Sequence, residues 1–194
     1  MKYLIIAGLF LSVLIAGCTQ PPQYEPIREI NVAGHPQVYA FGNDIRQSIL
    51  VKAESEKEIH DLFQNERRLN IVFNGTDELD NGMFRIALID ISSKIPFYFA
   101  AEGRTTNIDI YYFLTDNGTQ WYNSTNEPIA EPPLAGLTLW LKGPATGATD
   151  TSVSLQNKTV LLQGTSQKNV SLAADKLTLV VFGINNLTDI EKVE

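Results

Sequence analysis

The chain contains 194 residues, of which 44% are hydrophobic, and it carries a formal net charge of −7 at pH 7. This length and apolar content suit a single domain with an ordinary core. The acidic balance argues against a nucleic-acid partner or binding to anionic headgroups, because both are bound mainly through clustered lysines and arginines.

The N-terminal segment has the parts of a secretory signal. Lys2 provides a positive start, and residues 3–16 form an almost uninterrupted apolar run. This run is shorter than the roughly 20 residues that a membrane-spanning helix needs. It ends in the sequence Leu14-Ile15-Ala16-Gly17-Cys18. That ending resembles the lipobox of exported lipoproteins, in which a branched apolar residue and two small residues precede the cysteine.

The resemblance implies that residues 1–17 are removed as a signal peptide and that Cys18 is acylated. A diacyl anchor would hold the chain on the outer, extracytoplasmic face of the cell membrane, at roughly 0.8 kcal/mol per buried methylene. Loss of Lys2 changes the net charge from −7 to −8. Residues 18–26, with three prolines, are predicted to form an extended tether. The alternatives are an ordinary signal peptide with a chance cysteine and an uncleaved anchor.

Residues 27–194 are predicted to form one extracytoplasmic domain, whose elements follow from apolar spacing and turn residues. Gly34-His35-Pro36 supplies a turn, and acidic or amide residues precede the first helices. In chain order we expect a hairpin (27–32 and 37–41), a helix at 45–51, a helix opened by Ser55, a buried strand at 69–73, a helix at 83–95 and a strand at 107–114.

The second half of the domain is predicted with more ambiguity. The polar stretch 116–133 indicates an exposed excursion, because it contains two glycosylation sequons and three prolines. Residues 179–184 could continue a helix or form a last strand, and β-branching weakly favours the strand. Between these we expect a strand at 137–141, a loop at 143–151, a hairpin of 153–155 with 160–163, and a helix over 170–177.

This order of elements favours an α/β domain with a mixed β-sheet packed by helices. Pro96 is expected to bend or end the helix that begins near residue 83. If residues 83–99 formed two strands instead, the fold would be a mostly-β sandwich. Asp77 and Asp80 are interpreted as helix-start residues. They do not fit a calcium loop, because Leu79 stands where a ligand is needed.

Six Asn-x-Ser/Thr sequons occur, whereas random placement of the 14 Asn and 25 Ser plus Thr residues would give roughly two. Turns are rich in Asn and Thr, which accounts for part of the excess. We predict N-glycosylation at several of the six. A lipobox with dense sequons is similar to the pattern of archaeal surface lipoproteins. The candidate asparagines are Asn74, Asn117, Asn123, Asn157, Asn169 and Asn186.

Few residues indicate a catalytic or metal site. Cys18 is the only cysteine, and His35 and His60 are the only histidines. The mature chain therefore has no second thiol for a disulfide, and we predict neither a metal site nor a cofactor. His60 beside Asp61 could form a general base. The serines show no G-x-S-x-G elbow, so we name no catalytic residue.

Two groups of residues are candidates for ligand binding. The small-residue loop after residue 142 could turn backbone amides toward an anion, and its candidate residues are Gly143, Thr146, Gly147 and Thr149. It lacks the Gly-Lys-Ser/Thr of a P-loop and could equally be a connector. Trp121, Tyr122 and Trp140 could offer faces on which sugars stack, although buried aromatic residues are commoner.

These features favour a non-enzymatic lipoprotein that binds an envelope protein or a small ligand. A glycan-processing enzyme is the main alternative, although the sequence offers no identifiable pair of catalytic carboxylates. A further alternative is an accessory subunit of an envelope transport or secretion complex.

Overall fold

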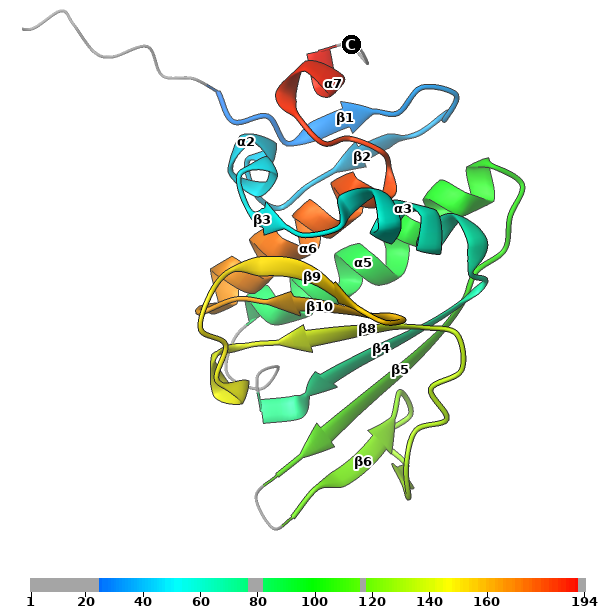
Figure 1. Cartoon of the computed structure of the whole chain (residues 1–194), viewed down its shortest axis with the longest axis vertical. Coiled ribbons are helices and arrows are strands. Elements are labelled where there is room, and N and C mark those ends of the chain that lie inside the picture. Colours follow the sequence, from blue (N-terminus) through cyan, green and yellow to red (C-terminus); the bar gives the residue numbers. More distant parts are fainter. Residues whose placement is uncertain (1–24, 77–81, 116–117, 192–194) are drawn as a thin grey trace, which may run out of the picture.

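The computed structural model describes residues 25–76, 82–115 and 118–191. Cys18, most of the tether, Asp77, Asp80 and Asn117 lie outside these ranges. The described chain forms three layers: a large sheet, a layer of long helices, and a layer built around a small hairpin (Figure 1). The predicted α/β domain with a mixed sheet packed by helices is confirmed.

The sheet is mixed, with four parallel strands at its centre. Its strands, in spatial order, are β3 (Lys52–Ala53), β9 (Ser152–Gln156), β10 (Thr159–Gln163), β8 (Leu137–Lys142), β4 (Arg68–Asn74), β5 (Asn107–Leu114), β6 (Gln120–Asn123) and β7 (Pro128–Ile129). Strands β10, β8, β4 and β5 run parallel, whereas β9 and β6 join this core antiparallel, and β3 is paired parallel to β9 at one edge.

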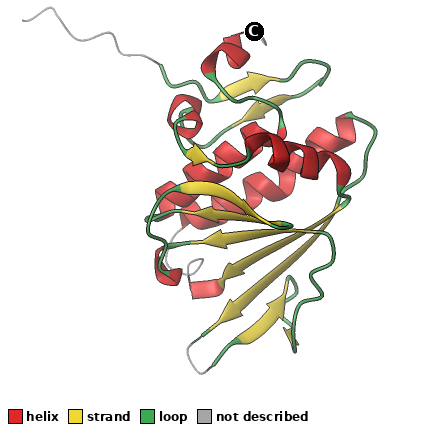
Figure 2. Ribbon diagram, in the orientation of Figure 1, coloured by secondary structure: helices red, strands yellow, loops and turns green. Residues whose placement is uncertain are grey.

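The long helices lie on one face of the sheet and leave the other face without a long helix in the described chain (Figure 2). Strand β4 shows the division, because Leu69, Ile71 and Phe73 enter the main core while Val72 points to the opposite face. The helices of this layer are α3 (Glu56–Asn65), α5 (Gly82–Ala101) and α6 (Gln167–Val181).

A third layer covers the outer side of these helices. The predicted hairpin is confirmed, since β1 and β2 pair antiparallel with Ile30 opposite Tyr39. Tyr39 packs on Phe182 at the end of α6, with ring centroids 4.6 Å apart. This layer consists of β1 (Glu29–Asn31), β2 (Val38–Ala40), α2 (Ile45–Ile49) and α7 (Leu187–Glu191).

Helix α5 is one continuous helix, so the sandwich alternative is wrong. It also passes through Pro96, where the sequence predicted a bend or an end. Proline removes one backbone donor, but the turns beyond it are held by tertiary packing. Ile95 and Phe99 are buried in the core against the layer of α6.

Helix α6 corrects a second prediction, because the favoured strand at 179–184 is wrong and Val181 is still helical. Leu179, Val180 and Val181 are fully buried. The helix lies between the sheet and the hairpin layer, and a helix enclosed on two sides is apolar around much of its circumference. Burial therefore outweighs the β preference of branched residues.

The predicted excursion at 116–133 is also corrected, because it contains the edge strands β6 and β7. Cross-strand aromatic pairs hold β6 in register, with Tyr112 opposite Tyr122 and Phe113 opposite Trp121. In the described ranges, no helix is both long and apolar enough to cross a membrane.

Candidate functional site

The predicted ligand loop folds into a short 3-10 turn, η1 (Pro144–Thr146), after β8. The amides of Thr146 and Ala148 donate to the Gly143 carbonyl, at 3.2 and 3.3 Å, and the Gly147 amide donates to Pro144 at 3.1 Å. These three donors are used within the loop and are not presented to an anion. The cavities described below are lined by other residues, so ligand binding at Gly143, Thr146, Gly147 and Thr149 stays a prediction.

The two histidines have structural partners. His60 Nδ1 lies 3.2 and 3.1 Å from the carbonyl oxygens of Val180 and Val181, so it donates to the last turn of α6. Asp61 instead pairs with Lys57. His35 stacks on Tyr98, with ring centroids 4.5 Å apart. The possible general base formed by His60 and Asp61 is therefore not assembled.

The sequons differ in accessibility. Asn74 is only 4% exposed, and its Oδ1 accepts from the Thr76 amide at 2.9 Å, which makes it the poorest acceptor among the described sequons. Asn157 and Asn186 are exposed. Asn123 and Asn169 are partly exposed, and their side-chain amides donate to Glu127 and Thr165. Glycosylation at the accessible sites stays a prediction.

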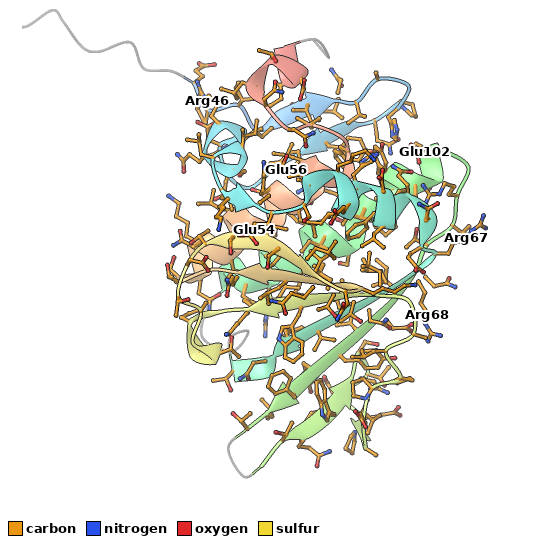
Figure 3. The ribbon with its side chains drawn as sticks, in the orientation of Figure 1. Arg46, Glu54, Glu56, Arg67, Arg68 and Glu102 are labelled. Carbon is orange, nitrogen blue, oxygen red and sulfur yellow. The ribbon has the colours of Figure 1, made fainter. Side chains whose placement is uncertain are left out.

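A buried polar cluster joins α2, α5 and α6. Asn43 donates to Asp175 Oδ2 at 2.8 Å and to Ser171 at 2.9 Å, while Ser48 contacts the same carboxylate oxygen at 3.4 Å. Burial raises the pKa of Asp175 to about 6, against the hydrogen bond from Asn43 and the charge of Lys94. Nearby, Lys176 Nζ lies 2.7 Å from Glu56 Oε1, which projects from the start of α3 (Figure 3).

Four large apolar side chains are exposed on α5 and β2. Ile86, Ile89 and Phe97 of α5 are 40%, 62% and 63% exposed, and Val38 of β2 is 56% exposed. Phe97 and Val38 line a common cavity, and Ile86 lies against Gly42 just after β2. We call these four residues and the free edge of β2 the β2–α5 surface. Apolar side chains that are exposed around a common cavity, as Val38 and Phe97 are, mark interaction sites on soluble proteins.

The edge of β2 that faces this surface has unused backbone groups. The Phe41 amide donates to Arg28 O at 2.7 Å, and hydrogen-bonded pairs alternate along an antiparallel ladder. Tyr39 therefore bonds toward β1, whereas Val38 and Ala40 turn their N–H and C=O groups to the other edge. Among the described residues, no strand pairs with this edge.

A cavity of about 360 Å³ lies along that edge, lined by Gln37 to Ala40 and by Lys94 and Phe97 of α5. The Lys94 ammonium is buried, 2.8 Å from Asp90 Oδ2 and 4.5 Å from the centroid of the Phe41 ring. Lys94 and Asp90 form an ion pair, but there is no hydrogen bond between them. The charge of Lys94 is therefore balanced by Asp90, and its ammonium nitrogen is buried beside the cavity.

The face of the sheet opposite the long helices carries a row of three aromatic rings, Trp121, Phe113 and Trp140. Phe113 lies 4.9 Å from Trp121 and 6.2 Å from Trp140, measured between ring centroids. All three rings are partly exposed. Tyr122 was predicted, together with the two tryptophans, to offer a stacking face for sugars. It instead points to the opposite face of the sheet and stacks on Tyr112, with ring centroids 5.0 Å apart.

A second cavity of about 360 Å³ adjoins this aromatic row. Asp109 and Tyr111 of β5 line it, together with Asn123 of β6. They share the face of the row, because Tyr111 pairs with Asn123 and Phe113 with Trp121. The remaining lining comes from Ile108, Ile110, Ser124, Ile129, Glu131 and Pro133.

Compared with models of known protein families, with curated protein sequences and with solved structures, the chain shows no match. In the part of the chain that the structure describes, no group of three or more His, Cys, Asp or Glu residues could hold a metal ion.

The β2–α5 surface was not predicted from the sequence. A signal was present, because α5 carries Ile86, Ile89 and Phe97 in addition to its buried stripe and so is apolar around most of its circumference. A helix of this kind needs a second covering. The free edge of β2 could not be seen in the sequence, because it depends on which strands pair.

Proposed function

We propose that this chain is a membrane-anchored, extracytoplasmic lipoprotein whose non-enzymatic domain binds a partner polypeptide at the β2–α5 surface. The observation that carries the proposal is the free edge of β2 beside four exposed apolar side chains. The acylated Cys18 would hold the domain at the outer face of the membrane, where an envelope protein could reach this surface.

The chemistry of the surface selects a polypeptide. The outward N–H and C=O groups of Val38 and Ala40 match the backbone of an extended strand, which can add to a free sheet edge. An apolar side chain of that strand would enter the cavity between Val38 and Phe97. Because Asp90 balances the charge of Lys94, the wall of this cavity carries no uncompensated charge from that pair.

The anchor is tested by replacing Cys18 with serine. We expect Cys18→Ser to leave the protein unprocessed or released from the membrane, because the lipobox cysteine supplies the acylated sulfur. Fractionation and mass spectrometry of the mature N-terminus measure this. Thr19→Ser is the control and should stay anchored. An unmodified Cys18 in the wild-type protein, or cleavage at another residue, would contradict the proposal.

The partner surface is tested by placing the photo-crosslinking residue p-benzoylphenylalanine at position 38 in the native membrane. We expect a discrete adduct with a second polypeptide. The further substitution Phe97→Asp should lower its yield about tenfold or more, because a charge replaces an apolar contact at the centre of the surface. Gel analysis and peptide mass spectrometry identify the adduct.

The matched control places the same crosslinker at Leu50, which is 84% exposed but lies at the end of α2. This position should give no such adduct. Equal adduct yields from the two positions, or a yield at position 38 that Phe97→Asp leaves unchanged, would contradict the proposal. An adduct with the mass of two copies would show self-association and overturn a separate partner.

A further inference from the structure

The open face of the sheet combines two kinds of surface that one ligand can use together. The rings of Trp121 and Phe113 form a partly exposed apolar surface, with their planes inclined by 54°. Tyr111 comes two residues before Phe113 and Asn123 two residues after Trp121, and both line the polar cavity, so the cavity begins about 7 Å from these rings. A ligand that spans both must carry apolar faces and hydrogen-bonding groups side by side.

The wall of the cavity is held in place by a buried amide. Asn70 is fully buried, and its Nδ2 donates to the carbonyl oxygen of Ala135 at 2.8 Å. This bond fixes the segment after β7, which brings Glu131 and Pro133 to the cavity. The cavity is therefore built on strands and a tied segment, which keeps its polar groups in fixed positions.

The charges of the cavity exclude an anionic ligand. Asp109 and Glu131 both line it. Arg68, at the start of β4 (Figure 3), is bound to Asp109, with Nε 2.7 Å from Oδ2, so its charge is already balanced. An uncharged ligand rich in hydroxyl groups suits the carboxylate acceptors of Asp109 and Glu131.

We infer that this face is a binding site for a neutral saccharide chain. One sugar ring places its C–H face on Trp121, beside the inclined ring of Phe113, and the neighbouring sugar directs its hydroxyl groups to Asp109 and Glu131. Aromatic side chains suit such contacts because they offer large rigid apolar faces at the protein surface. This site is separate from the β2–α5 surface and does not depend on the proposed function.

Isothermal titration calorimetry of the purified full chain tests the inference. The probes are the neutral hexasaccharides cellohexaose, maltohexaose, mannohexaose and chitohexaose, with hexagalacturonate as the anionic comparison. We expect at least one neutral probe to bind with a Kd of about 1 mM or lower. Trp121→Ala should weaken that binding about tenfold, and Trp121→Phe should restore most of it, because a ring is retained.

The control is Tyr122→Ala, which removes the neighbouring ring on the opposite face and should leave the affinity unchanged. Thermal melting of each variant confirms that it is folded. The inference is overturned if no neutral hexasaccharide binds, if Trp121→Ala and Tyr122→Ala have equal effects, or if hexagalacturonate binds more tightly than every neutral probe.

Discussion

Gly164→Ala is expected to cause a large loss of stability. Gly164 follows β10 and is buried against the first turn of α6. A Cβ atom there would lie 2.3 Å from Val170 N and 2.5 Å from Asn169 C. Both are backbone atoms, so relief requires α6 to move away from the sheet. Overpacking costs typically 1–3 kcal/mol and more where the backbone must shift, so we expect a loss of about 3 kcal/mol or more.

Chemical denaturation of the purified protein measures this loss. Gly42→Ala is the matched control, because its Cβ would only reach Ile86 Cγ2 at the ordinary distance of 3.7 Å. That variant should unfold within about 0.5 kcal/mol of wild type, as surface substitutions do. Equal stability of the two variants would show that the contact between β10 and α6 is looser than described.

Asp175→Asn is expected to change how stability depends on pH. Burial raises the pKa of the Asp175 carboxyl from 3.8 to about 6 in the folded protein, so the folded state holds this proton more tightly than the unfolded state. The contribution is fully present below about pH 4 and is lost as pH rises through about 6. A shift of this size corresponds to about 3 kcal/mol as an order of magnitude.

The substitution replaces the carboxyl with a side chain that stays neutral. The stability of Asp175→Asn relative to wild type should therefore increase between pH 4 and pH 7.5, by up to about 3 kcal/mol. Denaturation curves at both pH values give the difference. Asp150→Asn, which removes an exposed carboxylate, controls for net charge. Parallel pH curves for wild type and Asp175→Asn would contradict the expected shift.

The groups facing Asp175 explain why the shift is upward. Asn43 and Ser48 donate to one carboxylate oxygen, whereas Oδ1 has no hydrogen-bond partner among the described residues. The charges of Lys94 and Asp90 act in opposite directions, because the first favours the carboxylate and the second disfavours it. The cost of burial is therefore only partly offset, and the cluster ties α2 and α5 to α6 at the expense of stability at neutral pH.

Periodic apolar patterns predicted most of the fold. The strand at β5 and the hairpin of β9 with β10 were predicted because apolar alternation and turn residues agree there. The strand predicted at 179–184 failed because tertiary burial overrides the preference of branched residues. Strands β6 and β7 were missed because their polar and proline residues resemble a loop, while their pairing depends on Phe113 and Tyr112 of another strand.

The candidate sites were predicted less well from the sequence than the fold was. Trp121 and Trp140 were proposed for sugar stacking, but their common face depends on the order of strands, which places β4 and β5 between them. The β2–α5 surface carries no motif. It arises because β2 has only one neighbour and because α5 places its apolar residues on two sides. Both features depend on contacts between residues far apart in the sequence, so no local sequence pattern predicts them.

The central position of α6 has a consequence for the way the chain reaches its native state. The helix is enclosed by the sheet, α5 and the hairpin layer, and Phe182 at its end packs on Tyr39. The sheet and the hairpin layer both lack the buried apolar side chains of α6 until this C-terminal segment has been synthesised. Contacts between segments so far apart in sequence close slowly and late. We therefore expect the core of a growing chain with this topology to stay incomplete until α6 has been synthesised.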